Sequence, residues 1–282
     1  MDYCVKTLCY TLEVSRSAYY AYCKGDTYVV SDVKEALSIQ VSQVFHVHKR
    51  RYGSRRISKE LQNQGIQVGR CATRTIMNEQ ALRAIQPKSF VPKTTNSRHT
   101  LGYAPNLLTD RTFPTTPNEV YVGDITYLPT TYGKWLYLST WMDLYSRRIV
   151  GWKVDTNMEE SLIIESLEQA LYKQSPSEGL IIHSDRGGQY AGAAFKKLLN
   201  DHHCKQSMSV ADNPYDNAFA ESLFSRFKAE SLPKGGYESK QQAISLIYEY
   251  IEMYYNTERL HSSLNYQSPS EYEKRYYQSK TN

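Results

Sequence analysis

The chain has 282 residues, with 34 lysines and arginines against 29 aspartates and glutamates, so its formal charge is +5. Hydrophobic residues make up 40% and charged residues 22%, a balance that excludes wholesale disorder and collagen-like repeats. No run of about eighteen apolar residues occurs and no apolar segment opens the chain, so the sequence predicts neither a membrane span nor a secreted precursor.

Cysteine usage and charge distribution narrow the class of protein further. Five cysteines, an odd number without a CxxC pair, favour a reducing cytoplasm over a disulfide framework. Residues 1–100 carry 16 basic and 7 acidic side chains (+9), residues 101–230 carry 12 and 16 (−4), and residues 231–282 carry 6 of each. The basic first part predicts a polyanionic partner, because phosphate contacts release condensed counterions. The acidic middle part is consistent with carboxylates that hold metal.

Residues 1–85 are predicted to be helical. Apolar residues at helical spacing indicate two short helices within residues 4–22, with Ser15 as the cap of the second. Further helices are expected from about Val33 to His48, from a cap at Ser54 through Leu61, and from about Cys71 to Leu82. Short helices joined by tight turns, with arginines on the last one, predict a helix-turn-helix DNA-binding region. The alternative is a basic helical bundle without that function.

Basic side chains of this region are the candidates for DNA contact. They are Arg55, Arg56, Arg70 and Arg74. For the first two, an exposed helix start is the alternative interpretation. His46 and His48 could suggest zinc, but no CxxC pair accompanies them at a workable distance, so a zinc site is not predicted.

The rest of the chain predicts a linker and then an α/β domain. Prolines among Thr, Ser and Asn make residues 86–117 a linker with extended stretches. The expected elements that follow are strands at 120–128, 135–142 and 148–154, a helix at 158–172, a strand at 179–183, a helix at 193–200, a strand at 204–209 and a helix after Asp216. This order, βββαβαβα, predicts a ribonuclease H-like α/β domain over residues 118–230. Residues 231–282 are expected to form a helical C-terminal extension.

Three carboxylates lie at informative places in this domain. Asp124 is inside the first predicted strand, and a charge within an apolar strand needs a reason. Asp185 directly follows the fourth strand, at the kind of strand end where α/β sheets place their sites. Glu221 lies on the last helix and shares a face with Lys228, seven residues later. All-oxygen ligands of this type suit Mg²⁺.

The spacing of two of the carboxylates and the sequence motifs around them resemble those of one family. Asp185 and Glu221 are separated by 35 residues, which resembles the D,D-35-E core of retroviral integrases and DDE transposases. Five sequence motifs occur in the same order along the chain as in that family: YGSRRI at 52–57, GDITY at 123–127, HSDRGGQY at 183–190, SMS…NPYDNAFAESLFSRFKAE across 207–230 and RLHSSLNYQSPSEY at 259–272. Over nearly the whole chain they resemble the catalytic, second-frame product of bacterial two-frame insertion sequences.

The resemblance implies an integrase-type ribonuclease H-like core that acts as a DDE transposase, a metal-dependent polynucleotidyl transferase. Water would cleave a phosphodiester at the end of the element, and the freed 3′-OH would attack another DNA strand. Asp124, Asp185 and Glu221 would hold Mg²⁺ or Mn²⁺, as two ions, with Asp124 shared between them. Alternatives are a catalytically inactive DNA-binding relic or regulator, and a ribonuclease H-like nuclease without strand transfer.

The resemblance also implies partners. These are the terminal inverted repeats and target DNA, further copies of the chain, and the upstream-frame product or a fusion with it, in a bacterial cytoplasm at the nucleoid and away from membranes. Lys228 matches a basic position that the family aims at terminal DNA. Gln189 belongs to the HSDRGGQY motif of the family and is a candidate for DNA contact; the alternative is that its side chain braces its own loop. Two departures are Tyr121, where tryptophan is common, and the loop at 210–212, which lacks the usual basic residue and glycine.

Overall fold

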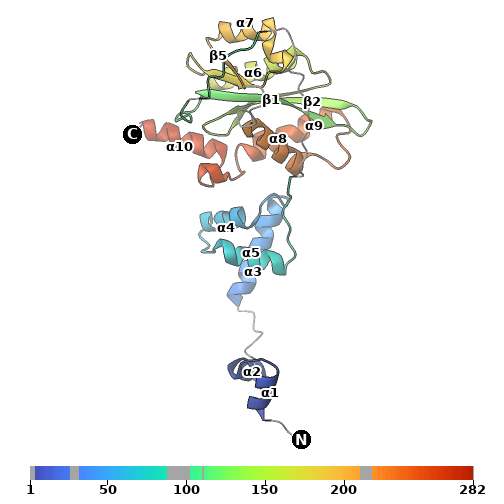
Figure 1. Cartoon of the computed structure of the whole chain (residues 1–282), viewed down its shortest axis with the longest axis vertical. Coiled ribbons are helices and arrows are strands. Elements are labelled where there is room, and N and C mark those ends of the chain that lie inside the picture. Colours follow the sequence, from blue (N-terminus) through green and yellow to red (C-terminus); the bar gives the residue numbers. More distant parts are fainter. Residues whose placement is uncertain (1–3, 26–31, 88–101, 110, 210–217, 282) are drawn as a thin grey trace. The chain divides into compact units, whose positions relative to one another are not determined.

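The computed structural model describes residues 4–25, 32–87, 102–109, 111–209 and 218–281. The chain divides into two compact units, Met1–Ala84 and Ile85–Asn282 (Figure 1). In the part of the chain that is described, no helix combines the length and apolar character needed to cross a membrane.

The first unit is helical, as predicted. Helices α1 (Val5–Thr11) and α2 (Arg16–Cys23) contact each other, and the Ser15 hydroxyl caps α2 by accepting a hydrogen bond from the Ala18 amide at 3.1 Å. This confirms the cap predicted at Ser15, which satisfies one of the amides that a helix leaves unpaired at its start.

Three further helices of the first unit pack on one another. They are α3 (Asp32–Val47), α4 (Ser54–Asn63) and α5 (Arg70–Glu79). Their buried apolar side chains are Val41, Val44, Phe45, Tyr52, Ile57, Leu61, Val68, Ile76 and Met77. The predicted cap at Ser54 is wrong: Ser54 is already helical, and Gly53, which has no side chain to offer, occupies the cap position. The six residues between α4 and α5 form the turn of a helix-turn-helix pair.

The second unit is built on a five-stranded mixed sheet. Its strands are β1 (Val120–Pro129), β2 (Trp135–Asp143), β3 (Ile149–Asp155), β4 (Ile181–Ser184) and β5 (Lys205–Met208). Their order in the sheet is β3-β2-β1-β4-β5. The first three form the predicted antiparallel meander, whereas β1–β4 and β4–β5 pair in parallel. The predicted ribonuclease H-like order of elements is therefore confirmed.

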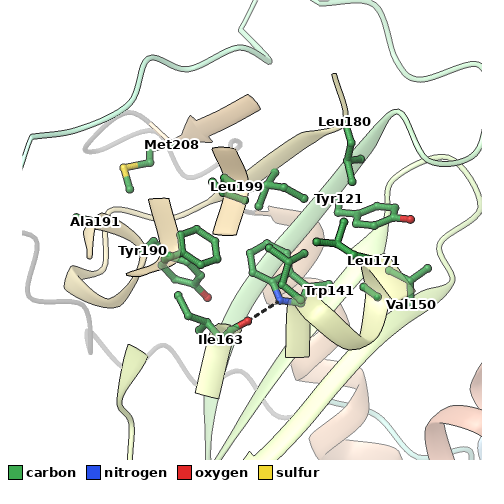
Figure 2. Packing of buried hydrophobic residues seen from close by; sticks show 14 residues of the cluster. Tyr121, Trp141, Val150, Ile163, Leu171, Leu180, Tyr190, Ala191, Leu199 and Met208 are labelled. Carbon is green, nitrogen blue, oxygen red and sulfur yellow. Dashed lines mark hydrogen bonds between the residues drawn. The ribbon is translucent and has the colours of Figure 1, made fainter. Parts of the chain in front are cut away.

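Helices cover both faces of this sheet (Figure 1). On one face, α6 (Glu160–Gln174), the short helix η1 (Gly188–Ala191) and α7 (Ala193–Asp201) enclose a core around Trp141 (Figure 2). The Trp141 ring lies directly over Gly123, where a β-carbon would come within 2.2 Å of it. Glycine at position 123 therefore lets the largest side chain of this core approach β1, next to Asp124.

On the other face lies α8 (Ala218–Ser231), which packs against β1. The C-terminal extension follows as α9 (Lys240–Tyr248), the π-helix η2 (Glu249–Tyr255), the short helix η3 (Ser262–Leu264) and α10 (Pro269–Thr281). A buried ion pair joins the extension to α8: Arg259 donates from Nε and Nη2 to the two carboxylate oxygens of Glu230, at 2.8 and 2.6 Å. The Tyr250 hydroxyl donates to the same carboxylate at 2.9 Å.

The outer strands of the sheet are bonded along their outer edges. The Asn256 side chain accepts from the Ile149 amide and donates to the Ile149 carbonyl, both at 3.0 Å, and thus acts as a partner strand for β3. Gln169 accepts from the Trp152 amide of the same strand at 2.9 Å. On the opposite edge, the Met208 amide of β5 donates to the carbonyl of Pro105 at 3.3 Å.

The buried ion pair generates a stability prediction. Arg259→Met should lower the free energy of unfolding of the second unit by about 3–5 kcal/mol, because it leaves the Glu230 carboxylate buried without its cation. Urea unfolding followed by tryptophan fluorescence measures this unit alone, since all three tryptophans, at 135, 141 and 152, lie in its sheet.

Arg275→Met is the matched control, because its ion pair with Glu271 is exposed and should contribute less than about 1 kcal/mol. The double variant Arg259→Met/Glu230→Met should recover part of the loss, since neither charge is then left alone. Equal stability losses for the Arg259 and Arg275 variants would contradict the prediction.

Candidate active site

Two of the three predicted carboxylates lie toward the same end of one strand pair. The parallel pairing of β1 with β4 ends where Val122 lies opposite His183. Asp124 and Asp185 each follow two residues beyond this last pair, so the pairing directs both chain segments toward the same end of the sheet. Asp124 is half-buried within β1, and Asp185 is half-buried directly after β4. The buried Tyr190 lies near both carboxylates. Burial is the main cause that raises the pKa of Tyr190, and the charges of Asp124 and Asp185 raise it further.

Backbone amides hold both carboxylates in place. Oδ1 of Asp124 accepts from the Ile125 amide at 2.7 Å, and Oδ1 of Asp185 accepts from the Gly187 amide at 2.9 Å. A β-carbon on Gly187 would lie only 3.0 Å from that Asp185 oxygen, so glycine leaves room for the carboxylate.

The third carboxylate comes from α8. Alternation along β1 points Val120 and Val122 toward the face where they pack with Ala220 of α8, and Asp124 continues the same alternation. Glu221 follows Ala220 directly and is exposed. Lys228, seven residues later on α8, is half-buried. Burial lowers the pKa of Lys228, and the negative charge of Asp124 acts in the opposite direction, which indicates that the two side chains are near each other.

The three carboxylates are not gathered into one cluster. Among the residues that the structure describes, no three His, Cys, Asp or Glu side chains converge as ligands of a single ion. Asp124 and Asp185 lie toward the same end of the β1–β4 pair, whereas Glu221 lies near the start of α8. Residues 210–217, which include the departure at 210–212 and the Asp216 after which a helix was expected, lie outside the described residues.

The donor set nevertheless fits a hard divalent cation. All three candidate ligands supply carboxylate oxygens, and two of them lie just beyond the last residue pair of the neighbouring strands β1 and β4. Mg²⁺ needs only one or two protein carboxylates, because it keeps several of its waters. The residues present therefore suit Mg²⁺ or Mn²⁺ better than a metal that prefers nitrogen or sulfur.

The remaining predicted residue of this domain, Gln189, has a structural contact. Its side-chain amide donates to the carbonyl of Met158 at 3.1 Å, which ties the loop after β4 to the start of the α6 region. This is the bracing role that the sequence left open as an alternative to DNA contact.

The arginines of the helix-turn-helix region differ in their surroundings. Arg70 and Arg74 are exposed and one turn apart on α5, beside its buried residues Thr73, Ile76 and Met77. Arg55 is exposed as well. In contrast, Arg56 is half-buried, with its guanidinium 5.6 Å from the centre of the Tyr52 ring.

The contacts of His48 and Arg147 were not predicted from the sequence. The His48 ring stacks on Tyr52 at 3.7 Å, and burial, with Arg51 and Arg56 nearby, lowers its pKa to about 4. The Arg147 guanidinium lies 4.1 Å from the centre of the Phe219 ring, two residues before Glu221. Neither contact could be predicted from the periodicity of the sequence. The sequence near Arg147 indicates only that a residue other than glycine stands at the end of a tight turn.

Comparison with known proteins agrees with this arrangement. Residues 32–90 match the family described as "HTH-like domain", and residues 114–214 and 202–269 each match "Integrase core domain". The catalytic core domain of BIV integrase is similar to this chain at 16% identity, with a TM-score of 0.44, over 58% of this chain and 99% of that one.

Curated relatives extend along almost the whole chain. The transposase for insertion sequence element IS904 from Lactococcus lactis is 39% identical over 86% of this chain and 94% of its own length. A 31 kDa protein of insertion element IS600 from Shigella sonnei is 40% identical over 96% and 99%. These identities, with a helix-turn-helix unit that precedes an integrase core, show that the chain belongs to the family of insertion-sequence transposases of the DDE type.

Proposed function

We propose that Asp124, Asp185 and Glu221 are the catalytic carboxylates of this transposase and that they hold two Mg²⁺ or Mn²⁺ ions. The observation that supports the proposal is the β1–β4 register, which pairs Val122 with His183, two residues before Asp124 and Asp185, with α8 packed on the face of β1 that carries Val120 and Val122. Asp124, which lies in the central strand, would be shared between the ions. Asp185 and Glu221 would each complete one ligand set.

The chemistry is phosphoryl transfer without a covalent intermediate on the protein. In the first step, water attacks a phosphodiester at the end of the element, and the broken P–O bond leaves a 3′-OH. In the second, this 3′-OH attacks a phosphodiester of another strand, so that one P–O bond forms as another breaks. Divalent ions, when bound, stabilise the attacking and leaving oxygens. The carboxylates orient these ions, and Gly187 and Gly188 let a DNA backbone approach Asp185 closely.

DNA is positioned by the basic side chains. Arg70 and Arg74, both exposed on the second helix of the helix-turn-helix pair, would contact base edges or phosphates of the terminal repeats. Arg55 would contact a backbone phosphate. Arg56 and Gln189 would assist from their packed positions. Lys228 would hold the strand that leads into the carboxylates.

The working assembly would be an oligomer of this chain on paired DNA ends, at the nucleoid in the bacterial cytoplasm. The upstream-frame product, or a fusion with it, would be a further partner.

Replacement of a single carboxylate should abolish strand transfer. Asp124→Asn, Asp185→Asn and Glu221→Gln each remove a ligand charge at nearly constant volume, so folding and DNA binding should persist. The assay is the joining of pre-cut 3′-OH ends to plasmid DNA in Mg²⁺ or Mn²⁺, which also separates a transposase from a simple nuclease. Calorimetric Mn²⁺ titration should show weaker binding in each variant.

Glu168→Gln, an exposed change on α6, is the control and should leave joining unchanged. A carboxylate variant that retains strand transfer within tenfold of the wild type would remove that residue from the site.

Lys228 should matter for DNA rather than for metal. Seven residues along a helix span roughly 10.5 Å, so its ammonium should reach the strand that leads to the carboxylates. Lys228→Ala should weaken end binding, lower the salt slope of binding by about one and slow strand transfer, with Mn²⁺ affinity unchanged. Lys228→Arg should restore much of both activities. Lys197→Ala, an exposed change on α7, is the control, and equal behaviour of the two alanine variants from 50 to 200 mM salt would refute the role.

The helix-turn-helix arginines should supply the salt-dependent part of DNA binding. Arg70→Ala/Arg74→Ala should reduce the salt slope of end binding by about two, because each arginine contacts a phosphate or base edge. Fluorescence anisotropy with labelled terminal DNA measures this slope. Lys274→Ala, an exposed change on α10, should leave it unchanged. A double variant with the wild-type slope would place the DNA contact elsewhere.

A further inference from the structure

The turn between β2 and β3 ends on a strained residue. Arg147 has a φ of +62°, a left-handed conformation that suits glycine and that L side chains rarely adopt. The surrounding hydrogen bonds impose it: the Arg147 amide donates to the Asp143 carbonyl at 2.9 Å, and the Asp143 amide donates to the Arg148 carbonyl at 2.9 Å. The Asp143 side chain is buried and accepts from both the amide and the hydroxyl of Ser146. A side chain kept at a position that favours glycine points to a use for that side chain.

The Arg147 side chain lies against two aromatic rings. Its guanidinium carbon is 4.1 Å from the centre of the Phe219 ring and 5.1 Å from the centre of the Phe113 ring. The two rings are 6.1 Å apart and inclined at 59° to each other, so one cation contacts both of them. A planar guanidinium suits this arrangement, because it can stack on a ring face while it remains charged.

The two rings belong to segments that are far apart in the sequence. Phe219 is the second residue of α8 and precedes Glu221 by two positions. Phe113 belongs to the segment that leads from the helix-turn-helix unit into β1. The same turn also contributes Leu144, which packs with Ala220 of α8 and with Leu107 and Leu108 of that leading segment. The first turn of α8 thus lies against the β2–β3 turn through one cationic and one apolar contact.

We propose that Arg147 is a positioning residue for Glu221: through Phe219 it fixes the first turn of α8, and through Phe113 it ties that turn to the segment entering the core. The inference rests on the proposed role of Glu221. Asp124 and Asp185 are held by sheet pairing and backbone amides, whereas Glu221 is exposed near a helix start and depends on how that start is anchored. Arg147 supplies the anchor from a residue 74 positions earlier.

Three substitutions at position 147 separate this role from simple backbone geometry. Arg147→Gly relieves the left-handed strain but removes the cation. Arg147→Met keeps a long side chain without charge, and Arg147→Lys keeps the charge without the planar group. The matched control is Arg148→Met, one residue on, which removes the ion pair with Glu273 of α10 and leaves Phe219 untouched.

The measurements use the full chain. Hydrogen exchange of peptides spanning residues 218–227 reports on the start of α8. Calorimetric Mn²⁺ titration and the joining of pre-cut ends report on the site. For Arg147→Gly and Arg147→Met we expect faster exchange in these peptides, about tenfold weaker Mn²⁺ binding and strand transfer slowed about tenfold to a hundredfold, since a misplacement of about 1 Å has an effect of that size. Arg147→Lys should recover part of each, and Arg148→Met should leave all three at wild-type values once corrected for the folded fraction.

The outcomes are distinguishable. Wild-type exchange at 218–227 in Arg147→Met, or an Arg147→Gly variant as active as the wild type, overturns the positioning role. If Glu221→Gln weakens Mn²⁺ binding while Arg147→Met does not, Arg147 has no such role and the proposed function stands. If Glu221→Gln leaves Mn²⁺ binding and joining unchanged, the proposed function itself fails and the inference fails with it.

Discussion

The parallel pairing of β1 with β4 is the constraint on which the active site depends. β1 is the middle strand of the sheet, and it accepts an antiparallel partner on one side and a parallel partner on the other. Because side chains alternate along a strand, a shift of one residue in this pairing would move Asp124 to the opposite face. The apolar side chains of Val120 and Val122 on one face, and of Tyr121 on the other, oppose such a shift. Core packing therefore fixes the position of Asp124, the first of the proposed catalytic carboxylates.

Helix α8, which carries Glu221, is held at both of its ends by cations from other parts of the chain. At its first turn, Arg147 contacts Phe219, and at its last turn, Arg259 pairs with Glu230. The second contact is buried and bidentate, so the C-terminal extension belongs to the same compact unit as the sheet. Asp124 lies within β1, and Asp185 directly follows β4, so the sheet itself positions the backbone at or next to both residues. Glu221 lies on a helix outside the sheet, and its position depends on contacts such as these two.

The fold could be predicted from the sequence because it follows from local periodicity: alternation indicated β1, and a short apolar run indicated β4, directly before Asp185. The three carboxylates were predicted as a set from the family resemblance, and their role stays a prediction. Contacts between distant residues were not accessible in this way. Nothing near Arg147 in the sequence points to Phe219, and Glu230 and Arg259 are 29 positions apart. Local spacing also suggested a phosphate contact for Arg56, whose packing on Tyr52 depends on how the α3–α4 turn folds.

The bonded outer strands of the sheet affect how copies of this protein can meet. A strand edge with unpaired amides and carbonyls is a template on which another chain can add a strand, which leads to domain swapping or aggregation. Here Asn256 and Gln169 occupy the edge at Ile149 and Trp152, and the chain before β1 occupies the edge at Met208. Copies crowded together would have to break these bonds before their sheets could merge. The protein can thus reach a high local concentration without its copies joining through their edge strands.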